Sequence, residues 1–348
     1  MPLFYILMRA IISLLSLVLA VAANAALPGL TDTLANIIGK REVSVAVLTS
    51  HGDTICAGRD GMCDLASVMK FHQAAALSRV VDFDTLVNKR ITVYEADLKR
   101  NTWSPMRAAA TEVPFEIKPV ELLDYTLNMS DNNAADILFD RFAAPAKVDS
   151  IVRHDYGISD FAIGVTEDQM HADPELSRLN RSTALDAARL IYCFFTADTT
   201  ASATLVKAVM ARDTPFGRER IPAGIATSSA KVFHKTGTGF TAADSTVTPV
   251  NDLAFISYPT GRGYACYALA VFTGGMKPAE AEAIIAEISR AVYTAIIVNE
   301  SLTMINNAPL PYAGKKSGKA PSQSDNDTHV LGEIITETIF TIVDHALQ

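Results

Sequence analysis

The amino-acid sequence predicts an α+β fold, a mixed α/β sandwich in which strands from both ends of the chain share one antiparallel sheet flanked by helices. Two observations lead to this class. Strand-like patterns occur at residues 41–58 and again at 230–273, and helical periodicity dominates the stretch between them. A sheet built from the two ends, with an all-helical lobe inserted between them, accounts for this order of elements.

The first strand region is predicted to be a β-hairpin. Val43, Val45 and Val47 alternate along its first strand, and His51-Gly52-Asp53 provides a turn before the second. Helical spacing begins near Ser67. We expect further helices at residues 119–128, 132–142, 182–196 and 203–211, strands at 230–234, 252–258 and 264–273, and a final helix at 278–298.

These elements divide one domain, residues 26–298, into two lobes. Residues 26–65 and 213–298 form the α/β lobe, and residues 66–212 form the helical lobe. The seam between two such lobes is a favoured place for a small-molecule site. The formal net charge of −8 and the lack of Lys/Arg clusters in the sequence argue against a nucleic-acid partner, and we expect a monomer.

The N-terminal residues 1–25 have the pattern of a secretory signal peptide. Arg9 is their single charged residue, an apolar run follows at residues 10–22, and Ala23-Asn24-Ala25 has the small-x-small form that signal peptidase requires. We therefore expect cleavage near Ala25 and release into the bacterial periplasm. A membrane anchor is the alternative, because the residues before Arg9 are also apolar.

The C-terminal part of the chain differs in composition from the domain. Residues 299–329 are rich in polar residues and Pro, which predicts a flexible linker. Residues 330–348 are apolar again at near-helical spacing and predict an amphipathic segment. It can dock on the domain, lie on a membrane or bind a partner; we favour docking because few basic residues flank it.

The cysteine pattern predicts no metal centre. Cys56, Cys63, Cys193 and Cys266 match no zinc spacing. Cys56 and Cys63 are close enough in sequence to pair in an oxidising compartment, and unpaired buried thiols are the equal alternative.

Three short motifs carry the chemistry, and the first is Ser67-Val68-Met69-Lys70. A serine hydroxyl is a poor nucleophile until a neighbouring group takes its proton. Positions three apart share one face of a helix, so the Lys70 amine can reach the Ser67 oxygen.

The second motif, Ser130-Asp131-Asn132, falls between two predicted helices. Ser130 can pass a proton to a leaving nitrogen, and Asn132 can bind a substrate amide. The same residue types also form helix N-caps, and a motif can cap a helix and belong to an active site at the same time. Another Ser-Asp-Asn, at residues 324–326, lies in the predicted linker and is taken as chance.

The third motif, Lys235-Thr236-Gly237-Thr238, follows a strand-like run. Lys235 and Thr236 can present a cation and a hydroxyl to a substrate carboxylate. Gly237 lets a flat substrate approach the backbone, and the N–H groups of Thr238 and Ser67 can form an oxyanion hole.

Together and in this order, the three motifs are the signature of class A β-lactamases and penicillin-binding proteins. Over roughly residues 30–298 the chain resembles a class A serine β-lactamase. The runs at residues 67–72, 234–238 and 251–253 resemble its PER-like branch in particular. The resemblance implies the serine β-lactamase/penicillin-binding transpeptidase-like fold and a β-lactam substrate, and the reaction that it implies needs no cofactor and no metal.

Two glutamates compete to activate the water that hydrolyses the acyl-enzyme. Glu167, followed by His171 in place of the usual Asn, resembles the PER-like pattern and has the better position between the second and third motifs. Glu175 superficially resembles the commoner Glu-Pro-x-Leu-Asn pattern but would lie one loop too late. We therefore assign the general base to Glu167 and expect Glu175 to be a solvated loop residue.

The sequence departs from the commonest class A pattern at the neck of this loop. Gly164 and Asn180 stand near the positions of the usual Arg–Asp pair, which PER-like enzymes also lack. The resemblance implies a wider cavity that accepts bulky oxyimino-cephalosporins. Arg220 matches a PER-like arginine that helps Lys235 hold the substrate carboxylate, with a surface arginine as the alternative, and Trp103 either walls the cleft or packs in the core.

The resemblance implies acyl transfer in two stages, with Ser67 as nucleophile and Glu167 driving hydrolysis of the ester. Either Lys70, or Glu167 acting through water, takes the Ser67 proton during acylation. A D,D-peptidase or penicillin-binding protein shares the three motifs but would deacylate slowly, and a non-hydrolytic β-lactam sensor is a further alternative.

Overall fold

The computed structural model describes residues 27–261 and 263–306. The expected signal peptide and the amphipathic segment at residues 330–348 lie outside these residues, as does the linker from residue 307 onward. Among the described residues, none of the helices combines the length and the apolar character that a membrane span requires.

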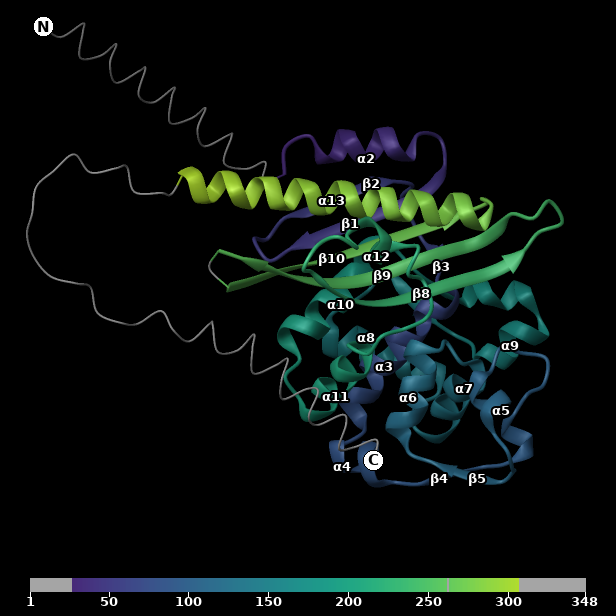
Figure 1. The fold of residues 1–348 in the computed structure, drawn as a ribbon. Coiled ribbons are helices and arrows are strands. Elements are labelled where there is room, and N and C mark those ends of the chain that lie inside the picture. Colours follow the sequence, from purple (N-terminus) through teal and green to yellow (C-terminus); the bar gives the residue numbers. More distant parts are fainter. Residues whose placement is uncertain (1–26, 262, 307–348) are drawn as a thin grey trace, which may run out of the picture.

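A five-stranded antiparallel sheet is the centre of the α/β lobe, as predicted. Strand β1 comes from the N-terminal region and pairs with β10 from the C-terminal region, with Val45 opposite Val271. The strand order is β2-β1-β10-β9-β8, and the strands are β1 (Glu42–Thr49), β2 (Thr54–Gly58), β8 (Lys231–Thr241), β9 (Val247–Thr260) and β10 (Gly263–Gly274). Both ends of the chain therefore build one sheet (Figure 1).

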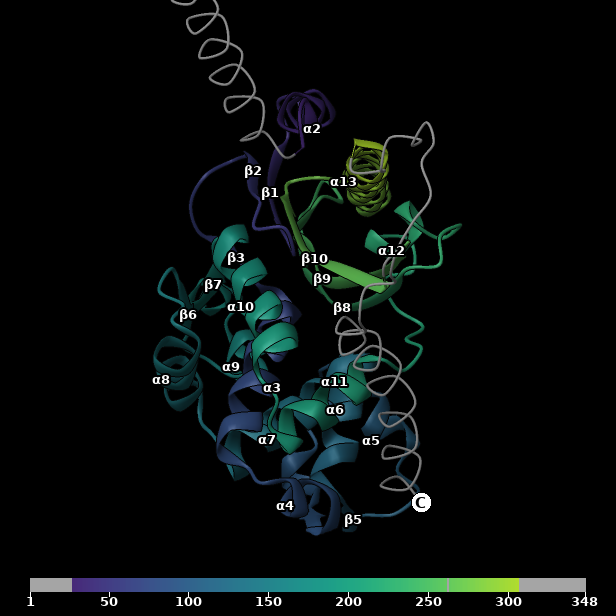
Figure 2. The same cartoon turned by 90° about the vertical axis from the view of Figure 1, so that its left-hand side faces the viewer.

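Helices cover both faces of this sheet (Figure 2). Because side chains alternate along a strand, Val43, Val45 and Val47 of β1 join the core under α2 (Leu30–Ile38) and α13 (Pro278–Asn306), near the short α12 (Ile221–Gly224). Ala46 and Leu48 face the other way, into the core shared with α10 (Ala184–Ala197) and the helical lobe.

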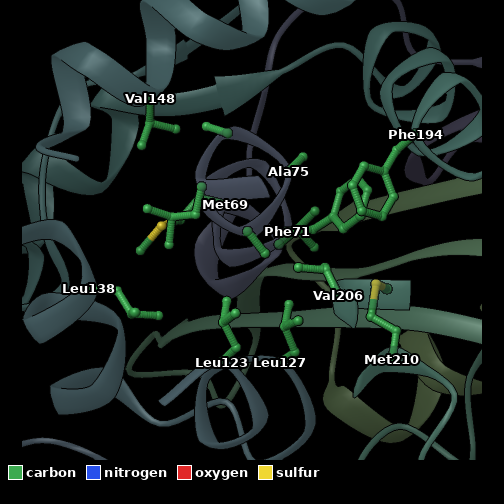
Figure 3. Close-up of a cluster of buried hydrophobic side chains, with 14 of the residues drawn as sticks. Met69, Phe71, Ala75, Leu123, Leu127, Leu138, Val148, Phe194, Val206 and Met210 are labelled. Atoms are coloured by element: carbon green, nitrogen blue, oxygen red, sulfur yellow. The ribbon is translucent and has the colours of Figure 1, made fainter. Parts of the chain in front are cut away.

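Helix α3 (Met69–Val80) runs through the middle of the helical lobe. Its residues from Met69 to Ser78 are all buried, which is typical of a central helix that is enclosed on every side. Figure 3 shows Met69, Phe71 and Ala75 among side chains of the surrounding helices. These are α6 (Pro119–Asn128), α7 (Asn132–Arg141), α8 (Pro145–Tyr156), α10 and α11 (Ala201–Met210).

Shorter elements complete the helical lobe and its border with the sheet. The helices are α4 (Phe83–Asn88), α5 (Pro105–Ala109) and α9 (Glu167–Ala172), with 3-10 helices η1 (Ala66–Val68), η2 (Glu95–Asp97) and η3 (Pro174–Leu179). Strands β3 (Cys63–Asp64), β7 (Asn180–Ser182) and β6 (Phe161–Ile163) form one small sheet, and β4 (Ile91–Val93) pairs with β5 (Phe115–Ile117).

The end of α13 corrects one predicted boundary. The helix runs to Asn306, so residues 299–306 are helical and do not belong to the linker predicted at 299–329. Composition was misleading here, because polar residues on an exposed helix resemble a linker, whereas the first proline after Val298 is Pro309. The Glu300 carboxylate accepts hydrogen bonds from Tyr258 and His51, which attach this last part of α13 to the α/β lobe.

All four cysteines lie in the described residues and none forms a disulfide. Cys63 is buried, and its Sγ lies 3.4 Å from Ser44 Oγ. The four thiols are thus unpaired, but only Cys63 is buried, and Cys56 is exposed.

Candidate active site

A cavity of about 480 Å³ lies between the two lobes. Its lining includes Ser67 from η1, Ser130 and Asn132 at the start of α7, Glu167 from α9, and Thr236 and Thr238 from β8. The three motifs and the loop glutamate, which are far apart in the sequence, therefore meet at one site in the seam.

Ser67 lies in the tight turn that leads into α3. The residue before it, Ala66, has φ 44°, a left-handed conformation that strains a side-chain-bearing residue. Lys70 Nζ donates to Ser67 Oγ at 3.1 Å, and Ser67 Oγ donates to Glu167 Oε1 at 3.3 Å. Lys70 Nζ also lies 2.9 Å from Glu167 Oε1, so the hydroxyl, the amine and the carboxylate contact one another.

The Lys70 ammonium is completely buried but well partnered. Besides Ser67 and Glu167, it donates to Asn132 Oδ1 at 2.6 Å and to the Ser130 carbonyl oxygen at 2.7 Å. A buried charge is tolerated when an opposite charge and hydrogen bonds compensate its lost hydration. Lys70 therefore ties the second motif and the loop glutamate to the Ser67 helix.

Asp131 fixes the turn that holds Ser130. Its carboxylate caps α7 through Ala134 N at 2.9 Å and also accepts from Met106 N at 2.7 Å. Burial raises the pKa of Asp131, and these hydrogen bonds act in the opposite direction. Ser130, at φ 53°, is held with its Oγ 3.0 Å from Lys235 Nζ and 3.5 Å from Lys70 Nζ. The capping and the site interpretations of this motif are thus compatible.

Lys235 lies on β8 with its amine turned into the protein. It donates to Ser130 Oγ and to the Thr236 carbonyl oxygen at 2.8 Å. Burial lowers the pKa of Lys235 well below its usual range, and the Lys70 charge adds to this effect. A negatively charged ligand beside Lys235 would oppose both causes of this lowered pKa.

Gly237 has a role in packing that is separate from the predicted approach of a flat substrate. A Cβ at this position would lie 2.5 Å from the Leu65 carbonyl oxygen and 3.1 Å from Val68 Cγ2. Glycine therefore lets β8 pack directly against the turn that carries Ser67. Its neighbours Thr236 and Thr238 line the cavity instead.

Arg220 is buried beside β8, which decides against a surface arginine. It donates to the carbonyl oxygens of Gly237 at 3.0 Å and Asn251 at 2.9 Å, and to Thr238 Oγ1 at 2.7 Å. Its guanidinium also lies 3.5 Å from the Glu282 carboxylate. Arg220 both braces the edge of the sheet and lines the cavity.

Asn180 closes the neck of the Glu167 loop, which we define as residues 164–180. Its fully buried amide accepts from Gly164 N at 2.8 Å and Val165 N at 3.1 Å, and donates to the Val165 carbonyl oxygen at 2.9 Å. Neutral hydrogen bonds thus stand where the usual ion pair is missing. Glu175 lies on η3 in an exposed ion pair with Arg178, as expected of a solvated loop residue.

Trp103 stands at the cavity wall rather than in the core. Its side chain is exposed, and its indole N–H donates to the Met129 carbonyl oxygen at 2.9 Å. The ring meets Phe216 edge-to-face, with centroids 5.8 Å apart. His171 lines the cavity from the Glu167 loop.

Sequence reasoning missed several lining residues, among them Phe216, Phe240 and Glu282. It also missed Asp136, which contacts the Glu167 loop. Asp136 follows Asn132 by four positions, and this helical spacing is the signal that would have found it. Within residues 27–261 and 263–306, no three His, Cys, Asp or Glu side chains are grouped to hold a metal ion.

Comparisons with known proteins agree with this geometry. The model of the beta-lactamase enzyme family matches residues 29–296. A beta-lactamase of Phocaeicola vulgatus is 31% identical over 280 residues, which are 77% of this chain and 85% of that protein. The extended-spectrum beta-lactamase PER-1 of Pseudomonas aeruginosa is 33% identical over 239 residues, 66% of this chain and 74% of its own.

A solved structure shows the same fold. The crystal structure of a class A beta-lactamase from Bacteroides cellulosilyticus superimposes with a TM-score of 0.71 at 29% identity, covering 78% of this chain and 98% of that one. From the family match, the relatives and the fold, the chain belongs to the beta-lactamase enzyme family and is a class A serine β-lactamase.

Proposed function

We propose that Ser67 opens the β-lactam ring to form an acyl-enzyme, and that water activated by Glu167 hydrolyses this ester. The observation that carries the proposal is the contact of Ser67 Oγ with both the Lys70 amine and the Glu167 carboxylate. A nucleophile in hydrogen-bond reach of a base is the arrangement that covalent catalysis requires.

Acylation uses the groups on the α3, α7 and β8 sides of the cavity. Lys235, Thr236 and Arg220 hold the substrate carboxylate, Asn132 binds the side-chain amide, and the N–H groups of Ser67 and Thr238 polarise the lactam carbonyl. Ser67 Oγ bonds to the carbonyl carbon as its proton passes to Lys70 in its neutral amine form or, through water, to Glu167. The C–N bond then breaks, and the nitrogen takes a proton from Ser130. The proton released by Ser67 returns to Ser130 Oγ through Lys70, which leaves Glu167 charged again.

Deacylation uses the Glu167 loop. The Glu167 carboxylate takes a proton from a water molecule while the water oxygen bonds to the ester carbon. The ester bond to Ser67 then breaks, and the serine oxygen regains a proton. The ring-opened acid leaves, and Glu167 returns to its charged form.

We further propose an extended substrate range that includes oxyimino-cephalosporins. The cavity volume and the neutral closure of the loop neck by Asn180 support this proposal, as does the similarity to PER-1. Turnover of cefotaxime at background level beside rapid turnover of benzylpenicillin would contradict it. The signal-peptide pattern of residues 1–25 supports a secreted periplasmic enzyme cleaved near Ala25. We propose that it acts as a monomer and do not expect its C-terminal segment to contact a membrane.

An intact-mass time course of the mature protein with benzylpenicillin tests the mechanism. We expect an adduct on Ser67 that forms and clears within seconds and leaves penicilloate. An adduct that persists for many minutes would indicate a penicillin-binding protein or a sensor, and the absence of any adduct would contradict the role of Ser67.

A further inference from the structure

Asp136 links the helical lobe to the helix that begins with Glu167. It lies on α7, one turn after Asn132, and its side chain is partly buried. Its two carboxylate oxygens accept separate backbone hydrogen bonds, Oδ1 from Glu167 N at 2.8 Å and Oδ2 from Asp168 N at 2.7 Å. The general base is therefore attached at its own backbone to a second carboxylate.

These two hydrogen bonds complete the N-terminus of α9. The first four N–H groups of a helix have no partner within the helix. Here Asp136 accepts two of them, from Glu167 N and Asp168 N, Thr166 Oγ1 accepts from Gln169 N at 3.3 Å, and Gln169 Oε1 accepts from Thr166 N at 3.0 Å. Half of the cap comes from another helix, so the position of α9 depends on Asp136.

The charges around Asp136 make its ionisation sensitive to the site. On α9 it faces Glu167 and Asp168, of which Asp168 is paired with Lys99 at 3.7 Å, and on α3 it faces Lys70. Burial and the Glu167 charge raise the pKa of Asp136 to about 7, against the lowering effect of Lys70 and the two N–H groups. The carboxylate therefore changes charge near neutral pH.

We propose that Asp136 is a positioning residue whose two carboxylate oxygens hold the backbone of Glu167 and Asp168, so that hydrolysis of the acyl-enzyme depends on its ionised form. Acyl-enzyme formation depends on it less, because the Lys70 amine also lies within reach of the Ser67 proton. This inference rests on the proposed roles of Ser67 and Glu167.

The physical reason lies in the two N–H groups from which Asp136 accepts. Protonation of Asp136 places an O–H where one of these two donors needs an acceptor. The start of α9, which carries Glu167, then loses a hydrogen bond, and this loss slows deacylation below about pH 7.

The test compares Asp136→Asn with a matched control, Asp140→Asn. Asparagine keeps the shape of Asp136 but has no charge and only one acceptor oxygen. Asp140 lies one turn further along α7, exposed and next to Arg141. Formation and decay of the benzylpenicillin adduct are followed by rapid quench and intact mass from pH 5.5 to 8.5.

We expect the wild-type decay rate to fall below about pH 7. In Asp136→Asn, decay at pH 8 should be about 10- to 100-fold slower, its dependence near pH 7 should be lost, and adduct formation should stay within about threefold. Asp140→Asn should behave as wild type.

Unchanged decay and an unchanged pH profile in Asp136→Asn would overturn the proposal, as would an equal loss in formation and decay. Should the variant not fold, the wild-type profile is decisive, because a decay rate that is flat across this pH range contradicts the proposal. Absence of any adduct on the wild type would overturn the proposed function together with this inference.

Discussion

The two sides of the active site are supported in different ways. Ser67, Ser130 and Lys235 stand at the start of a buried helix, on a capped turn and on a strand of the main sheet. Lys70 Nζ donates to both Ser67 Oγ and Ser130 Oγ, and Lys235 Nζ donates to Ser130 Oγ. Glu167 stands on a six-residue helix within the Glu167 loop. That loop is held by the buried Asn180 at its neck and by the partly buried Asp136, which accepts hydrogen bonds from the first N–H groups of its helix.

This difference indicates how the two chemical steps can be separated. Ser67, Lys70, Ser130 and Lys235 belong to the packed framework. Glu167 belongs to a local structure that a few hydrogen bonds determine. Changes to the framework should therefore affect both steps, whereas changes to the loop should affect hydrolysis of the ester most, and acylation only to the extent that Glu167 takes the Ser67 proton.

The largest effect is expected for the nucleophile. Ser67→Ala should lower kcat/KM for benzylpenicillin by roughly 10⁴-fold or more, because no covalent intermediate can form. Steady-state hydrolysis checks the rate, and intact mass should show no adduct. Residual turnover above about 1% of wild type would contradict the role of Ser67.

The second-largest effect is expected for a change in the packed framework next to Ser67. Gly237→Ala places a methyl group 2.5 Å from the Leu65 carbonyl oxygen, so β8 and the Ser67 turn must move apart. Such a shift should slow acylation by about 100-fold. Single-turnover kinetics measure this rate, with Lys231→Ala on an exposed part of the same strand as control. Normal acylation in Gly237→Ala would show that this close packing does not matter.

A change at the loop neck should be smaller and more selective. Asn180→Ala leaves two N–H groups and one carbonyl oxygen without their partner, which should cost about 2–3 kcal/mol of stability. We expect adduct decay to slow at least about 10-fold while formation is nearly unchanged. Arg178→Ala, in the exposed part of the loop, is the control. Equal slowing of both steps would contradict the separation.

A buried histidine of the framework should affect stability without affecting chemistry. His72 lies on α3 with its Nε2 unpartnered, and burial lowers its pKa from 6.5 to about 4. The unfolded chain therefore binds a proton below pH 6.5 that the folded protein does not. The contribution to stability is complete above pH 6.5 and decreases toward pH 4, by about 3 kcal/mol in all.

Urea unfolding of wild type and His72→Leu at pH 4.5 and 7 measures this contribution. The difference in unfolding free energy between the two pH values should be smaller in the variant. An identical difference in both proteins would show that another group causes the acid sensitivity.

The sequence predicted the framework better than the loop, for physical reasons. Alternating valines, the spacing from Ser67 to Lys70 and the order of the motifs are local patterns, and they led to the sheet, the helical lobe and the meeting of Ser67, Ser130 and Lys235. The helices α6, α7, α10 and α11 begin and end within two residues of the predicted ranges. The helical period of the apolar residues and the capping residues at the helix ends determine such boundaries.

Contacts between residues that are far apart in the sequence could not be predicted from local sequence patterns. Gly237 was predicted to let a flat substrate approach the backbone, whereas its close packing against Leu65, a residue far away in the sequence, was not predicted. The loss of the usual ion pair at the loop neck was visible, whereas the hydrogen bonds that Asn180 makes instead were not. Helical residues 299–306 were mistaken for linker because exposed helices and linkers share a polar composition.

The most direct test of the separation is a single-turnover experiment on Glu167→Gln with benzylpenicillin, followed by intact mass. The account predicts that the Ser67 adduct still forms and then decays roughly 10³-fold more slowly than in wild type, because the ester has lost its general base. Decay at the wild-type rate would contradict the role of Glu167 and the division of the site into two independently supported halves.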